Sequence, residues 1–173
     1  IFGVMLSVIA MGAWAQPQFS HPHGLYRQTT LTVGISATDS EAEIRYTIDG
    51  SVPTAQSNLY TAPLTINATT LLRAAEVKAD TLCSAVTTAS YIFVESVLSQ
   101  PNDPVGYPAE WGQYTDIQGT AIADYEMDPE MTGDETLRLK IVEGLYDLPI
   151  LSIVTDKDNL FSHENDTARG GIY

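Results

Sequence analysis

The sequence of 173 residues contains a single cysteine, Cys83. With one thiol the chain has no intramolecular disulfide framework, so a folded domain has to be held together by apolar burial and strand pairing. Cys83 itself is expected to be a small buried apolar side chain.

Basic residues are also scarce. Lys and Arg together number 8 against 22 Asp and Glu, and the formal net charge is −14. This balance disfavours binding to nucleic acid or to an anionic membrane surface, because both carry negative charge. The acidic excess is compatible with solubility outside the cell and with cation binding, and charge alone does not choose between them.

Long apolar runs are absent except at the start of the chain. Residues 1–12 are almost continuously apolar, and Ala13-Trp14-Ala15 has the small-x-small form of a signal peptidase site. The run is shorter than the roughly 20 apolar residues that a transmembrane helix needs. We therefore predict a signal peptide over 1–15, no other transmembrane segment, and a secreted or cell-surface protein. An uncleaved anchor and a lipoprotein are the alternatives.

What the chain does contain is a strict alternation of apolar and polar residues. Ile44, Tyr46 and Ile48 are expected on one face of a strand, with polar residues between them. Asp49-Gly50 follows as a pair suited to positive backbone φ, which predicts a turn. This pattern indicates half-buried antiparallel β structure.

Further short β segments are separated by turn residues. They cover residues 30–36, 60, 64–66, 71–77 and 89–94. Strands at this spacing are typical of an all-β sandwich. We predict a mainly β fold: a small immunoglobulin or fibronectin-III-like β-sandwich over 16–95, with Tyr46, Tyr60 and Tyr91 in its core, followed by a linker and an incomplete α+β segment.

The composition changes after the sandwich. Prolines between residues 95 and 112 predict an extended, turn-rich connector without regular structure, and we assign 96–131 to a Pro-rich acidic connector. From Thr132 a helical pattern begins, with Leu137, Ile141 and Leu145 at intervals of four. Thr132 is the expected N-cap, and the helix is expected to end by Pro149.

An apolar run with β-branched residues follows the predicted helix. Residues 150–154 are expected to form a buried strand, and residues 157–161 a short capped turn. A helix that leads into a buried strand marks the start of an α+β or α/β domain. We therefore assign 132–173 to the truncated start of a second domain.

No motif predicts a catalytic or cofactor site. The serines lack a nucleophile elbow, and the sequence has no glycine-rich loop that could hold a phosphate. Asp156-Lys157-Asp158 begins like a calcium loop, but Phe161 and Thr167 stand where an EF-hand needs Gly and Glu. We therefore expect neither a cofactor nor enzymatic activity in these residues.

Two other groups could hold a metal and are interpreted as structural. The acidic residues between 116 and 135 could bind a cation or supply the paired carboxylates of a glycosidase, but a solvated surface is the simpler account. His21 and His23 could share one face of a strand, yet a zinc site needs at least three protein ligands.

Aromatic residues outside the strands are the remaining functional lead. Tyr107, Trp111 and Tyr114 lie in or beside the connector. An exposed flat ring can stack on the apolar face of a sugar, so these residues are candidates for carbohydrate contact. The alternative is that they cover the seam between the two units.

Two parts of the chain resemble known families. The sandwich region resembles the Fn3-associated or chitobiase/β-hexosaminidase C-terminal type of module at residues 44–54, 57–60, 63–64, 70–74 and 90–93. The remainder resembles the region that precedes the kinase-like domain of secreted CotH-family (spore-coat) proteins at residues 97–98, 100–104, 123–129, 148–156, 159–161 and 171–173.

These resemblances imply a non-catalytic accessory module of a secreted or cell-surface protein, acting in spacing, docking or adhesion. Its expected partners are a cell-surface glycan or the downstream domain of the same protein. One alternative is a carbohydrate-binding module. Another is a region that leads into a secreted kinase-like enzyme whose catalytic part lies beyond residue 173.

Overall fold

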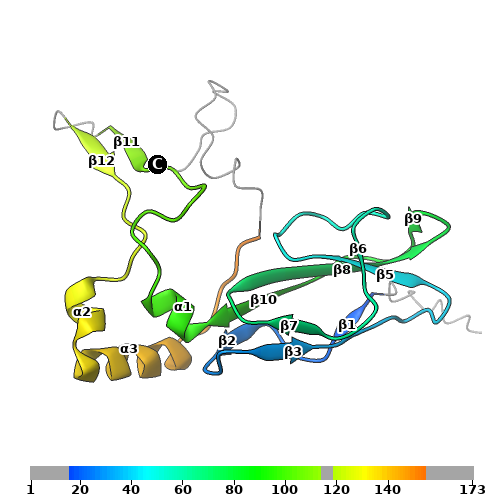
Figure 1. Cartoon of the computed structure of the whole chain (residues 1–173), viewed down its shortest axis with the longest axis horizontal. Coiled ribbons are helices and arrows are strands. Elements are labelled where there is room, and N and C mark those ends of the chain that lie inside the picture. The colour runs from blue at the N-terminus through cyan, green and yellow to red at the C-terminus, as the bar shows by residue number, and fades with distance from the viewer. Residues whose placement is uncertain (1–15, 114–118, 155–173) are drawn as a thin grey trace, which may run out of the picture.

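The computed structural model describes residues 16–113 and 119–154, drawn as coloured ribbon in Figure 1. Among these residues, six strands form the larger sheet. Its order is β2 (Gly24–Tyr26), β10 (Thr87–Phe93), β8 (Thr70–Lys78), β5 (Glu43–Thr47) and β6 (Asn58–Leu59), and β9 (Thr81–Leu82) also pairs with β8. Neighbouring strands are antiparallel, except that β2 runs parallel to β10.

Two short antiparallel pairs form the second layer. β3 (Leu31–Val33) pairs with β7 (Leu64–Ile66), and β1 (Gln18–Phe19) pairs with β4 (Ile35–Ser36). Figure 1 shows β1, β3 and β7 lying against the larger sheet. The predicted mainly β sandwich is therefore confirmed, and it is followed by a small part that contains short helices and one hairpin.

The core lies between the two layers. Strand alternation turns every second side chain inward, so both sheets contribute to one apolar interior. Its buried members are Leu31, Val33, Ile35, Ile44, Ile66, Leu72, Ala74, Ala89, Tyr91 and Phe93. Tyr91 lies in this core as predicted, whereas Tyr46 and Tyr60 are partly buried against its edge.

Tyr91 connects the N-terminal segment, residues 19–26, to the core. Its ring is fully buried and lies 5.8 Å from the ring of Tyr26 and 6.5 Å from that of Phe19, centroid to centroid. Its hydroxyl donates a 3.0 Å hydrogen bond to the carbonyl of His21. Burial raises the pKa of the Tyr91 phenol, so the hydroxyl remains a donor at ordinary pH.

Two predictions about single residues of the sandwich are wrong. Ile48 is 55% exposed, because β5 ends at Thr47 and the chain turns at Asp49-Gly50, where Gly50 has a φ of 87°. Cys83 is exposed. It lies just after β9, at the edge of the larger sheet, and its backbone N–H donates to the Glu76 carbonyl at 2.9 Å.

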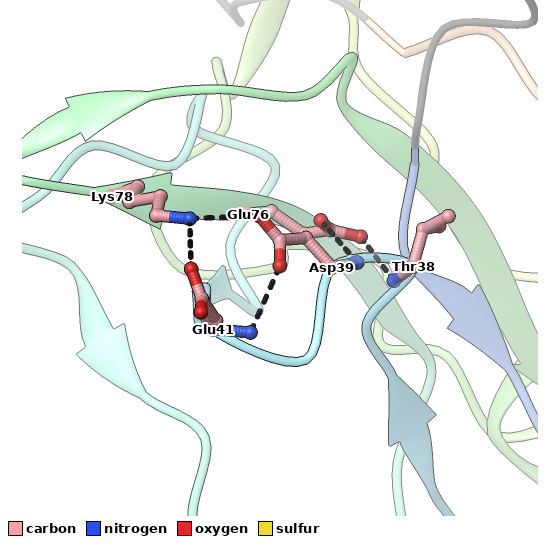
Figure 2. Close-up of polar contacts among 5 residues, drawn as sticks. All are labelled: Thr38, Asp39, Glu41, Glu76 and Lys78. Atoms are coloured by element: carbon pink, nitrogen blue, oxygen red, sulfur yellow. Dashed lines mark hydrogen bonds and ion pairs between the residues drawn. The ribbon is translucent and has the colours of Figure 1, made fainter.

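A buried carboxylate holds the loop between β4 and β5. Glu76 on β8 is 1% exposed, and its two oxygens accept from the backbone N–H groups of Thr38 at 2.6 Å and Asp39 at 3.2 Å. Figure 2 shows this contact beside an exposed ion pair from Lys78 to Asp39 and Glu41. The buried charge is thus satisfied by directed hydrogen bonds, as buried ionised groups require.

The part after the sandwich is more regular than predicted. β10 continues directly into α1 (Val94–Leu98), where Val94 and Leu98 are buried. A hairpin of β11 (Glu110–Gln113) and β12 (Thr120–Ile122) follows. Residues 95–112 are therefore not an irregular connector throughout. Apolar burial at the start of α1 and pairing of β11 with β12 stabilise structure there.

Helix formation begins before the predicted N-cap. α2 (Pro129–Gly133) is capped by Asp128, whose carboxylate accepts from Glu130 N at 2.9 Å. α3 (Glu135–Asp147) is capped by Asp134 in the same way, at 2.9 Å from Leu137 N. Thr132 lies inside α2, so it caps neither helix. Aspartate accepts these N–H groups at least as well as threonine and also complements the helix dipole.

Two polar contacts connect α3 to the rest of the described chain. Arg138 forms an ion pair with Glu95 in α1. The guanidinium of Arg27 lies 4.3 Å from the ring centroid of Tyr146. Leu137, Ile141 and Leu145 are half-buried, in agreement with the predicted apolar face of the helix.

The predicted buried strand at 150–154 is wrong. This segment is assigned to no strand, and Leu151 and Ile153 are 86% and 75% exposed. A strand needs a neighbouring strand for its backbone hydrogen bonds, and apolar composition does not supply one. The predicted turn at 157–161 lies outside the described residues. Within 16–113 and 119–154, no helix combines the length and apolarity needed to cross a bilayer.

Candidate functional site

The aromatic residues predicted from the sequence gather at the β11–β12 hairpin. Glu110 pairs with Ile122 and Gly112 with Ala121, so the register shifts between Glu110 and Gly112. Trp111 lies at this irregularity. A bulge changes the direction in which a side chain points from its strand. Here the side chain at the irregularity is Trp111, whose ring contacts the ring of Tyr125.

Tyr125 is the centre of the cluster. Its ring centroid is 5.6 Å from those of both Tyr107 and Trp111, and the Trp111 contact is edge-to-face at 83°. Trp111 Nε1 donates to the Tyr125 hydroxyl at 3.2 Å, and that hydroxyl donates to the Pro108 carbonyl at 3.0 Å. We call Tyr107, Trp111 and Tyr125 the aromatic cluster.

Backbone contacts hold the cluster in place. The side-chain amide of Gln100 donates to the Tyr125 carbonyl at 2.5 Å, and Tyr125 N donates to the Asn102 carbonyl at 3.3 Å. Ala123 N donates to the Ala109 carbonyl at 3.0 Å. These bonds join the segment before the hairpin to the segment after it, so the backbone positions from which the rings project are fixed.

The cluster is open to solvent and borders a pocket. Tyr107 and Trp111 are 51% and 41% exposed. A pocket of about 370 Å³ is lined by Tyr107, Tyr125, Ile122 and the polar residues Asn102 and Asp103, among others. Exposed rings beside hydrogen-bonding side chains provide the two kinds of contact that a sugar uses, an apolar face and directed polar groups.

Two of the three predicted site residues are thus brought together. Tyr107 and Trp111 share Tyr125 as a neighbour, and Tyr114 lies outside the described residues. Tyr125 was not predicted as a site residue, because it lies between Asp124 and Glu126 in a stretch interpreted as a solvated acidic surface. The signal that could have found it is the pair of β-branched residues Thr120 and Ile122, which could have predicted the returning strand of a hairpin.

The possible metal ligands are dispersed in the described structure. No group of three or more His, Cys, Asp or Glu that could hold a metal occurs in residues 16–113 and 119–154. His21 Nδ1 lies 2.9 Å from the Ser20 hydroxyl, and His23 is exposed. The partial calcium motif at 156–158 lies outside the described residues.

One family model matches part of the chain. Residues 21–88 match the family model of the chitobiase/beta-hexosaminidase C-terminal domain. The matched span begins before β2 and ends within β10, so the match covers most of the sandwich, which we call the chitobiase-type module, and none of the aromatic cluster. No curated protein and no solved structure matches the chain.

Proposed function

We propose that this chain is the non-catalytic N-terminal part of a secreted or cell-surface protein of CotH type, in which the chitobiase-type module serves spacing, docking or adhesion. The observation that carries the proposal is the family match over 21–88, on a sandwich whose interior is filled by apolar side chains. A filled apolar interior stabilises the fold and leaves no space for a ligand, so any function of the module lies on its surface.

Exposed apolar residues after α3 support the docking role. Leu148, Leu151 and Ile153 are 66%, 86% and 75% exposed. Several large apolar side chains on one exposed stretch are typical of a surface that another unit covers. We propose that the covering unit is the following domain of the same protein.

Hydrogen exchange tests this arrangement. The amides of residues 148–154 are compared in the chain alone and in a version that carries the following domain, with the β11–β12 hairpin as internal reference. We expect slower exchange at 148–154 in the longer protein and unchanged exchange in the hairpin. Equal exchange at 148–154 in both proteins would contradict docking. Hydrolysis of a chromogenic N-acetylglucosaminide above the buffer rate would contradict the non-catalytic role.

A second candidate function is carbohydrate binding, favoured by the exposure of Tyr107 and Trp111 beside a pocket with polar groups. Affinity electrophoresis of the chain in gels that contain soluble polysaccharides tests it. We expect the unmodified chain to be retarded and Trp111→Ala to abolish the retardation, because removal of the ring removes the surface on which a sugar face would stack. Val105→Ala is the matched control, because Val105 is fully exposed in the same region and carries no ring. Retention unaffected by Trp111→Ala would remove the cluster from binding.

A further inference from the structure

The outer face of the larger sheet, which points away from the sandwich core, carries a group of polar side chains. Thr88 on β10 pairs with Arg73 on β8. Tyr91 pairs with Gly24, so the residues one step earlier, Ser90 and His23, also lie next to each other. Cross-strand partners point to the same face, so one cation, one imidazole and two hydroxyls share this surface.

These side chains line a pocket. Its volume is about 510 Å³, and its lining includes His23, Arg73, Thr88 and Ser90. The segment after α3 forms another wall, with Ile150 and Leu151 as apolar members. The hydroxyl of Ser152 in that segment lies 2.5 Å from the hydroxyl of Ser90, which attaches the segment to the sheet. The pocket shares no lining residue with the pocket at the aromatic cluster.

Among the described basic residues, three form ion pairs, whereas Arg27, Arg73 and Lys140 form none, and of these three only Arg73 lines this pocket. Arg45, Lys78 and Arg138 each form an ion pair with a carboxylate. Arg73 has no such pair among the described residues. One of its terminal nitrogens donates to the Gly50 carbonyl at 2.9 Å, and its buried Nε, like that of Arg45, has no hydrogen-bond partner there.

Arg73 thus places a guanidinium without a described carboxylate partner in the lining of a pocket, in a chain with a net charge of −14. Carboxylates are abundant in this protein, yet none is placed against Arg73 in the part that the structure describes. A guanidinium recognises a carboxylate by paired, charge-assisted hydrogen bonds, and those bonds are strongest where water is partly excluded. The hydroxyls of Thr88 and Ser90 add donors and acceptors beside the cation, and Ile150 and Leu151 add an apolar wall.

We propose that this pocket binds a small hydroxylated carboxylate, such as one sugar-acid unit. Its carboxylate would contact Arg73, its hydroxyls Thr88 and Ser90, and its apolar face Ile150 and Leu151. The site shares Leu151 with the stretch proposed for docking, and it shares no lining residue with the pocket at the aromatic cluster.

Calorimetric or NMR titration of the mature chain from Gln16 tests the site with three probes: D-glucuronate, D-glucose and acetate. We expect saturable binding of glucuronate. Glucose lacks the charge and acetate lacks the hydroxyls, so each should bind at least about tenfold more weakly, the loss expected when a charged hydrogen bond or a set of neutral ones is removed. Binding of glucose as tight as that of glucuronate would overturn the role of charge, and equally tight acetate would overturn the role of the hydroxyls.

Matched variants locate the binding site. Arg73→Gln should weaken glucuronate binding at least about tenfold, whereas Arg45→Gln, which removes the same charge outside the pocket, should leave it within about twofold. Because Arg73 also holds Gly50, Thr88→Val provides a second variant that retains the guanidinium, and it should weaken glucuronate binding more than it weakens acetate binding. No saturable binding by the unmodified chain, or equal losses in Arg73→Gln and Arg45→Gln, would refute the proposal.

Discussion

Replacing Glu76 tests how far one buried carboxylate stabilises the sandwich. Its oxygens accept from two backbone N–H groups, at 2.6 Å and 3.2 Å, and the side chain is 1% exposed. A hydrogen bond to a charged group contributes about 1.5–3 kcal/mol. Thr38 is exposed, so water can replace part of this interaction in a variant. We therefore expect Glu76→Ala to lower the free energy of unfolding by about 2–4 kcal/mol.

Thermal and urea unfolding followed by circular dichroism measure this change. For a domain of this size each kcal/mol shifts the melting temperature by about 4–8 °C, so Glu76→Ala should lower it by at least about 8 °C. Glu76→Gln retains one acceptor and should cost about 1–2 kcal/mol. Glu43→Gln is the control, because its partly exposed ion pair with Arg45 should contribute less than about 1 kcal/mol. A Glu76→Ala protein within about 0.5 kcal/mol of the unmodified chain would refute the reasoning.

Three further predictions concern single positions. Gly50→Ala should destabilise the sandwich by about 1–2 kcal/mol or more, because φ is 87° there and an added Cβ would lie 2.8 Å from Leu71. Gly144→Ala in α3, with open space around it, should instead stabilise the protein by about 0.5–1 kcal/mol. Urea titration of both variants measures the two changes. Cys83 should react with a thiol reagent in the folded protein as fast as after unfolding, and a protected thiol would contradict its exposure. Hydrogen bonds from Glu41 N and from Lys78 lower the pKa of Asp39. Its stabilising contribution is therefore present above the unfolded pKa of about 3.9 and is lost as pH falls through the lower folded value. Asp39→Asn should flatten that part of the curve of melting temperature against pH, and an unchanged curve would show that the contact is not formed in solution.

Local patterns predicted the parts of the fold that depend on neighbours in sequence. The strand at 44–47, the turn at Gly50 and the buried Tyr91 follow from the period of a strand and from the conformational freedom of glycine. The apolar face of α3 follows from helical spacing in the same way. These features were predictable because each needs only the side chains within a few residues.

The wrong predictions share a different cause. Residues 150–154 have strand composition but no strand partner among the described residues, and Cys83 has core composition but lies at a sheet edge. Thr132 is a good capping residue, yet Asp128 and Asp134 occupy the capping positions. In each case the residue type is compatible with the predicted role, but contacts with residues distant in the sequence determine whether the residue pairs, is buried or caps a helix.

By itself the sequence determined the period of two in the strands, since alternation needs no knowledge of the partner strand, but it did not determine where a strand ends, and Ile48 is exposed for that reason. It also determined the excess of negative charge and the presence of exposed aromatic candidates. Only the tertiary structure decided that Glu76 would reach Thr38 and Asp39, that Tyr125 would join Tyr107 and Trp111, and that Arg73 would line a pocket with no carboxylate among its described residues. These arrangements join residues far apart in the chain, and strand pairing and loop closure, which no local pattern encodes, bring them together.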